Sequence, residues 1–169
     1  MIREMTIYEL SRAFKESMAL FYSASLGSLQ VAVRNLLARR LIAVRVVREG
    51  KRVKKIYRIL PTGTAAFRSS MKSEITPSRL EVTALSRLSF LGLLEEPREK
   101  KEVLDVIVET TRAVLSDLEK TKSDLEARSI PPSYHPIFRY QMKTLEYGIM
   151  AHRAGLEWFT SVLREIKKE

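Results

Sequence analysis

The feature that most constrains this fold is a pair of long apolar seams in the second half of the chain. In each seam, mostly apolar side chains recur at steps of three and four residues, which places them on one face of a helix. The first seam consists of Leu104, Ile107, Thr111, Val114, Leu118, Thr121 and Leu125. The second consists of Phe138, Met142, Leu145, Ile149, His152, Leu156, Phe159, Leu163 and Ile166. This period is typical of coiled-coil-like packing, so we expect two long antiparallel helices.

Breaks in the pattern set the expected ends of these helices. Residues 129–136 contain three prolines and predict a loop, so the first long helix should cover about 99–127. Before it, Ser78 can cap a helix that reaches Leu94. The two seams carry more apolar surface than one hairpin can bury, so we expect residues 73–169 to form a homodimer. A helical hairpin that packs only on itself is the alternative.

The first 72 residues follow a different pattern. Thr6 and Glu9 have the spacing of a capping box, and apolar residues at helical spacing follow them. Either Ser23 or Ser25 can cap a second helix that runs to about Arg40. Two short helices joined by a tight turn have the helix-turn-helix form.

Residues 42–59 change to a period of two, which predicts two strands joined by a turn at Gly50. Pro61 ends the second strand, and Thr62 can cap a short helix to about Lys72. Helix, helix, hairpin and helix is the order of a winged helix. We therefore expect a mainly α fold with a small β-hairpin wing, made of a winged helix-turn-helix domain at 1–72 and an all-α dimerisation domain at 73–169.

The charge of the chain is concentrated in its front part. Residues 1–72 contain 15 Lys and Arg and four Asp and Glu, a net charge of +11, whereas residues 73–169 carry −1 of the total of +10. A surplus confined to one segment indicates a polyanionic partner such as double-stranded DNA.

The second helix offers a surface that could read DNA. With Leu29, Val33, Leu36 and Leu37 turned toward the core, its outer face is mostly small. The residues predicted to touch DNA there are Ser25, Gly27, Ser28, Gln30, Val31, Arg34, Asn35 and Arg39. Arginine and asparagine can form paired hydrogen bonds with guanine and adenine, and valine can contact a thymine methyl group. A merely solvated surface helix is the alternative, and the basic hairpin beside it favours DNA.

The hairpin supplies candidates for phosphate contacts, namely Arg45, Arg48, Lys51, Arg52, Lys54 and Lys55. Because strand residues alternate sides, not all of them can face one duplex. We favour Lys51 and Arg52 at the tip, with Lys54. The alternative is a charged edge that discourages pairing between molecules.

The sequence offers little for catalysis or metal binding. It has no cysteine and only two histidines, His135 and His152, and it lacks a glycine-rich phosphate loop. We therefore expect no enzyme, no cofactor and no metal site. Because the chain has neither an apolar run of about 18 residues nor a signal peptide, we expect a cytoplasmic protein that does not bind membranes.

The chain resembles the PadR family of transcriptional regulators, in the long form with a C-terminal helical domain. The residues that carry this resemblance are IYEL at 7–10, SASLGSL at 23–29, LLARRLI at 36–42, KIYRI at 55–59 with Gly63, FLGLL at 90–94, and LEYG at 145–148 with Glu157 and Trp158. The resemblance implies a homodimeric repressor or activator, which in this family is often relieved by a small aromatic or hydrophobic effector. Of the two, we expect a repressor.

Three features depart from that family. Gln30 and Val31 stand where tyrosine and proline are common, and Arg40 stands where a glycine often ends the helix. The family's first helix normally precedes Ile7. We therefore expect the partner subunit's last helix, or residues further upstream, to cover the apolar side chains of the next helix, among them Leu10 and Phe14.

An effector could bind among the aromatic residues Phe90, Tyr147, Trp158 and Phe159, for which plain core packing is the alternative. The most concrete interpretation of the sequence is a sequence-specific, dimeric DNA-binding regulator. Two other functions stay open. One is an architectural DNA binder with little sequence preference, and the other is a winged-helix adaptor whose basic face meets an acidic protein.

Overall fold

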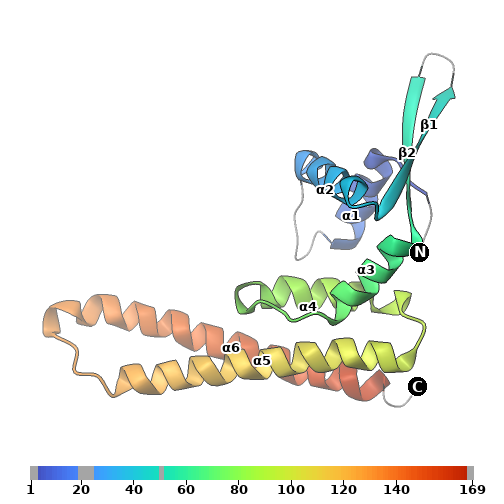
Figure 1. Ribbon diagram of the computed structural model, residues 1–169. Helices are drawn as coiled ribbons and strands as arrows, with labels where there is room; N and C mark the ends of the chain where they lie inside the picture. The colour runs from blue at the N-terminus through green and yellow to red at the C-terminus, as the bar shows by residue number, and fades with distance from the viewer. Residues whose placement is uncertain (1–3, 19–24, 50–51, 167–169) are drawn as a thin grey trace. The chain divides into compact units, whose positions relative to one another are not determined.

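A computed structural model describes residues 4–18, 25–49 and 52–166 of the chain (Figure 1). The helices are α1 (Ile7–Met18), α2 (Leu26–Ala38), α3 (Pro61–Lys72), α4 (Leu80–Ser89), α5 (Pro97–Glu126) and α6 (His135–Ile166). The strands are β1 (Ile42–Glu49) and β2 (Arg52–Ile59), and short 3-10 turns cover Pro77–Arg79, Leu91–Leu93 and Pro132–Tyr134. The predicted fold class, mainly α with one β-hairpin, is confirmed.

The chain divides into two compact units. The front unit contains Met1–Ser73 and Leu85–Leu94, and the helical unit contains Glu74–Ala84 and Glu95–Glu169. Within the front unit, helix, helix, hairpin and helix follow one another in the order of a winged helix. The expected division fell between Lys72 and Ser73, whereas here Leu85–Leu94 groups with the front unit.

Side chains cap the first two helices at the predicted positions. The Thr6 amide donates to Glu9 Oε2 at 2.7 Å, and the Glu9 amide donates to Thr6 Oγ1 at 3.3 Å, which completes the capping box of α1. The Ser25 hydroxyl oxygen accepts from the Ser28 amide at 3.1 Å and caps α2. The apolar face of α1 is only half-buried at Ile7, Leu10 and Phe14, so what covers it stays a prediction.

Helix α2 ends in a Schellman motif. The Leu41 amide donates to the Leu36 carbonyl, the Arg40 amide donates to the Leu37 carbonyl, and Arg40 has φ of 54°. This left-handed conformation usually belongs to glycine at the end of a helix. Arg40 thus adopts the backbone conformation that a glycine usually takes after the end of a helix.

The hairpin pairs β1 with β2 over its whole length, from Ile42 opposite Ile59 to Glu49 opposite Arg52. The predicted turn residue Gly50 lies outside the described residues. Met5 adds a short bridge on the other edge of β2, where its amide donates to the Tyr57 carbonyl at 3.1 Å and its carbonyl accepts from the Tyr57 amide at 2.8 Å. Met5, just before α1, is therefore joined to the second strand of the wing.

A tight joint links the end of α2, the base of the hairpin and the start of α3. The Leu60 amide donates to the Leu41 carbonyl at 3.0 Å. A Cβ on Gly63 would stand 2.0 Å from the same carbonyl oxygen, so only glycine fits there. The prediction that Thr62 caps α3 is wrong: Leu60 is the N-cap residue, and the Thr62 hydroxyl donates to the Arg40 carbonyl at 2.7 Å.

Residues 78–94 do not form the single helix that was predicted. Ser78 lies inside a 3-10 turn, α4 begins at Leu80, and a second 3-10 turn follows Phe90. Within the front unit, the Phe90 ring packs edge-on against Phe67 of α3 with centroids 6.3 Å apart.

Arg87 of α4 is a buried cation in the described part of the front unit. It is 5% exposed, and its Nη2 donates to Ser73 Oγ at 2.9 Å. Burial lowers the pKa of this guanidinium from its usual value.

Helices α5 and α6 lie side by side and antiparallel, as their seams predicted (Figure 1). The buried residues of the pair include Leu104, Ile107, Thr111, Met142, Ile149, Phe159 and Leu163. The predicted loop at 129–136 is shorter than expected, because a 3-10 turn occupies part of it and α6 starts at His135. Pro136 thus falls in the first turn of α6, where proline's missing N–H is not needed.

Candidate nucleic-acid interface

The outer side of α2 presents the surface that was predicted to read DNA. We call it the recognition face; it consists of Gly27, Ser28, Val31, Arg34, Asn35 and Ala38, and all six residues are exposed. Gln30 and Arg39 on its flanks are exposed as well. The predicted rotation of the helix is therefore confirmed, while contact with DNA stays a prediction.

The opposite side of α2 explains this rotation. Val33 is 5% exposed, and Leu29 and Leu37 are half-buried around it. Leu36, which the sequence pattern assigned to the core, is 37% exposed and lies at the edge of the buried side. The recognition face is thus held outward mainly by Val33.

The two serines at the start of α2 already hold each other. Ser25 Oγ accepts from the Ser28 amide, and the Ser28 hydroxyl donates to the Ser25 carbonyl at 2.8 Å. A phosphate contact by the Ser28 hydroxyl would therefore replace its bond to the Ser25 carbonyl, whereas Ser25 can cap α2 through its oxygen and still donate its hydroxyl hydrogen. Gly27 stands in open space, since an added Cβ would meet only Ser25 Oγ at 3.7 Å, so the glycine is not required by packing within the chain.

The wing places its lysines on both sides of the sheet. Lys54 lies opposite Val47 and Lys55 opposite Val46, so the two side chains leave β2 on different faces, and both are exposed. Lys51 lies outside the described residues, and of Arg52 only the backbone is described. Arg45 forms an ion pair with Glu4 at 3.0 Å, which leaves it less suited to a phosphate.

An open cleft of about 950 Å³ lies beside the recognition face, and we call it the α2–β2 cleft. The start of α1, the helix α2 and the strand β2 line it. Its lining residues are Thr6, Ile7, Tyr8, Gln30, Val33, Arg34, Leu37, Val53, Lys54, Lys55 and Tyr57. Sequence reasoning missed this cleft, because it depends on how far the hairpin stands from the helix, which no local pattern reveals.

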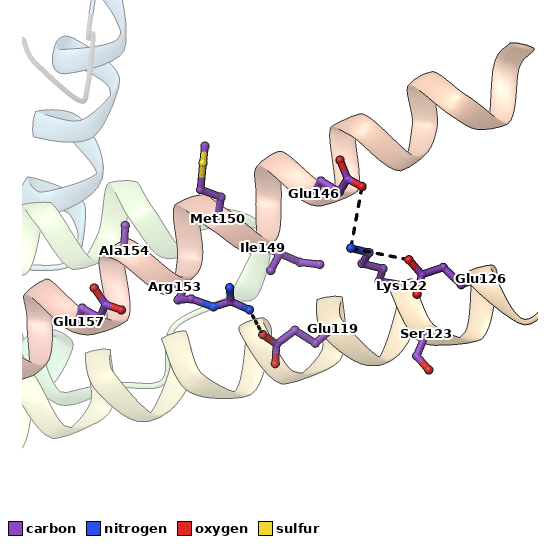
Figure 2. A pocket seen from close by; sticks show the side chains of 10 residues that line it. All are labelled: Glu119, Lys122, Ser123, Glu126, Glu146, Ile149, Met150, Arg153, Ala154 and Glu157. Atoms are coloured by element: carbon purple, nitrogen blue, oxygen red, sulfur yellow. Dashed lines mark hydrogen bonds and ion pairs between the residues drawn. The ribbon is translucent and has the colours of Figure 1, made fainter.

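A second cleft, of about 550 Å³, lies between α5 and α6 (Figure 2). Arg153 and Glu119 pair across it at 2.5 Å, and Lys122 lies 3.9 Å from Glu146. A hydrogen bond from Lys143 holds the pKa of the Glu146 carboxyl below its usual value. Most charged side chains of this cleft thus have partners within the α5–α6 pair, and several of these ion pairs join the two helices.

Helix α6 carries a second apolar surface that sequence analysis did not separate from the first. Tyr140, Tyr147 and Trp158 are 70%, 66% and 49% exposed. At 100° per residue they fall on one line with the exposed Ala154, roughly opposite the buried Met142 and Ile149. We call the line of Tyr140, Tyr147, Ala154 and Trp158 the outer stripe.

The four aromatic residues predicted to bind an effector are not gathered into either cleft described above. Phe159 is buried and packs edge-on against Trp158 at 5.2 Å, whereas Tyr147 and Trp158 lie on the outer stripe. Phe90 packs in the front unit. The effector site among them stays a prediction that the structure does not test.

The histidines make local contacts. His152 lies half-buried on the inner side of α6, and its Nδ1 donates to the Gly148 carbonyl at 2.8 Å. His135 starts α6, with Nε2 2.9 Å from the Ile130 carbonyl oxygen. No group of three or more His, Asp or Glu among the described residues could hold a metal ion. Within the same residues, no helix combines the length and apolar character that crossing a bilayer requires.

The chain is similar to several solved structures over nearly its whole length. Bacillus subtilis PadR in complex with operator DNA is 20% identical, with 96% of this chain and 90% of that chain covered and a TM-score of 0.41. The same protein in complex with p-coumaric acid is 21% identical, with 98% and 89% covered and a TM-score of 0.44. The PadR-like regulator BC1756 from Bacillus cereus is 22% identical, with 100% and 94% covered and a TM-score of 0.42. No family model and no curated protein matches the sequence.

Proposed function

We propose that this protein is a sequence-specific DNA-binding regulator of transcription that acts as a homodimer. The observation that carries the proposal is the exposed recognition face on α2 within a segment whose net charge is +11. Net charge alone would fit any polyanion. An exposed helix face that combines Arg34, Asn35 and Val31 adds side chains able to distinguish base pairs.

The proposed division of labour follows from the chemistry of each element. Helix α2 enters the major groove, where Arg34 pairs with guanine, Asn35 with adenine, and Val31 contacts a thymine methyl group. The lysines of the hairpin neutralise phosphates and fix the position of the helix. Arg39, at the far end of α2, is suited to a phosphate next to the groove.

The outer stripe supports the homodimer. Exposed tyrosine and tryptophan side chains aligned along one helix are characteristic of protein interfaces. A second copy of α6 offers the same stripe, so a twofold axis would bring the two stripes together. Two recognition helices related by such an axis require a DNA site with two inverted halves.

The sign of regulation and its control rest on the resemblance to the PadR family. It implies a repressor or an activator that a small hydrophobic or aromatic effector relieves, and we propose the repressor. The side chains proposed earlier for the effector, Tyr147 and Trp158 in particular, also belong to the outer stripe. A ligand bound there would therefore act on the dimer.

Selection of bound sites from random duplex by the full-length protein tests this function. We expect an enriched site with inverted halves, bound at least about a thousandfold more tightly than random DNA. Equal affinity for all duplexes would instead support an architectural DNA binder. Absence of duplex binding even at low salt would support the adaptor that binds an acidic protein.

A further inference from the structure

The α2–β2 cleft has an apolar floor. Val33 is 5% exposed, and Leu37, Tyr57 and Ile7 are half-buried beside it. Val53 extends this surface along β2 and is 62% exposed. Val33 thus forms the buried base of the floor, and the side chains around it leave an apolar surface that is open to solvent in the described front unit.

The rim of the same cleft is cationic. Arg34 contributes from α2, and Lys55 contributes from β2. None of the described residues that line the cleft is acidic. A ligand that enters between helix and strand would therefore meet positive charge on both sides before it reaches the floor.

This combination selects one class of ligand. A neutral apolar molecule would cover the apolar floor but would leave the positive charge of the rim without a counter-charge. An inorganic anion would pair with the rim but would leave the apolar floor exposed to water. A molecule with an apolar body and one anionic head satisfies both surfaces. The volume of about 950 Å³ is within the usual range of small-molecule sites.

We propose that the α2–β2 cleft binds an anionic amphiphile, with its apolar body on Val33, Leu37 and Tyr57 and its carboxylate or sulfonate between Arg34 and Lys55. Because Arg34 also belongs to the recognition face, the bound ligand and DNA compete directly. This competition rests on the proposed function, whereas binding of the ligand does not.

A pair of matched fluorescent probes tests the binding. The sulfonate 1-anilinonaphthalene-8-sulfonate has an apolar ring system and one negative charge, and N-phenyl-1-naphthylamine has the same rings without the charge. For the full-length protein, Arg34→Gln and Lys55→Gln should each weaken the sulfonate about two- to fivefold, as expected for exposed ion pairs. Neither substitution should change the affinity of the neutral probe.

Arg39→Gln is the matched control, because Arg39 is an exposed arginine of the same helical segment that does not line the cleft. It should leave both affinities unchanged. Sulfonate binding that is equally insensitive to all three substitutions would overturn the proposal. So would an equal loss in the Arg39→Gln variant, which would show a diffuse attraction to the basic surface.

Methyl NMR locates the probe. The sulfonate should shift the methyl signals of Val33, Leu37 and Val53 and leave that of Leu163 in the helical unit unchanged. Shifts confined to the helical unit would overturn the site even if the probe binds.

Competition with DNA is measured separately, by adding a short duplex to the protein loaded with the sulfonate. Release of the probe supports competition, and simultaneous binding of both overturns it. If the protein binds no duplex, the proposed function fails while the probe titrations still decide on the cleft. If duplex binds and the probe does not, only the cleft proposal fails.

Discussion

Arg34 and Asn35 are neighbours on the recognition face, and they should behave differently from Lys54 of the wing. Arg34→Ala and Asn35→Ala should each cost about 1–3 kcal/mol on the preferred site and less on random duplex, because only a matched base pair completes their hydrogen bonds. Lys54→Ala should weaken all duplexes alike and flatten the salt dependence by about one unit. Fluorescence anisotropy over a range of salt concentrations measures both effects. Equal losses for Arg34→Ala on specific and random DNA would mark Arg34 as a phosphate contact.

Arg40 gives a test of backbone strain at a single residue. Its φ of 54° places Cβ close to the following carbonyl, a conformation that costs about 1–2 kcal/mol for residues other than glycine. Arg40→Gly removes this cost but adds about 0.5–1 kcal/mol of chain entropy to be lost on folding. We therefore expect a net gain of about 0.5–1 kcal/mol in the free energy of unfolding.

The control for this change is Arg39→Gly, at the neighbouring residue with φ of −81°. There glycine relieves no strain and should lower stability. Urea unfolding of the full-length chain measures both variants. A loss of stability in Arg40→Gly would contradict the assignment of strain to this position.

At the scale of elements, the start of α1 depends on its capping box. Thr6→Ala removes the hydroxyl that accepts from the Glu9 amide and should destabilise the front unit by about 1 kcal/mol. Glu9→Gln keeps an acceptor for the Thr6 amide and should cost clearly less. Thermal unfolding followed by circular dichroism compares the two. A smaller loss in Thr6→Ala than in Glu9→Gln would show that the carboxylate charge matters more than the cap.

The helices and strands also show which structural features the local sequence can predict. The caps of α1 and α2, the hairpin and the rotation of α2 were predictable, because each depends on residues within a few positions of one another. The break of the predicted helix at 78–94 was not, because Phe90 leaves the helix where its ring packs against Phe67 of α3. Thr62 likewise bonds to Arg40, 22 residues away, instead of capping its own helix.

The candidate site was predictable where it depends on residues close together in the sequence, as the fold was. The recognition face came from periodicity alone, whereas the α2–β2 cleft requires the distance between two elements. The outer stripe on α6 was hidden because Tyr147 and Trp158 are aromatic, and aromatic residues at helical spacing are more often buried. Only the position of α5 shows that another face of α6 is already used for packing.

At the scale of the whole molecule, dimerisation should depend on the outer stripe. Tyr140→Ser combined with Tyr147→Ser should weaken the dimer at least about a hundredfold, because large aromatic side chains carry much of the binding energy at interfaces. Both side chains are exposed in the single chain, so its fold should persist. Sedimentation velocity should show a monomer for this variant and a dimer for the unaltered protein. The exposed Gln141 lies off the stripe, and Gln141→Ser should leave the dimer intact.

A double variant that sediments as a tight dimer would place the interface elsewhere. If it is a monomer, it should also bind an inverted site much more weakly, because one recognition helix then contacts one half of the site.

The joint at Leu41, Leu60 and Gly63 has a mechanical consequence. Because the end of α2 and the base of the β-hairpin share backbone hydrogen bonds at this joint, we expect α2 and the hairpin to move as one rigid unit. A signal that dislodges the wing would then tilt the recognition helix with it. Amide hydrogen exchange would reveal such coupling as a common opening rate for Leu41 and Leu60. We then expect the protein to dissociate from its DNA site in one kinetic step, with the contacts of helix and wing lost together.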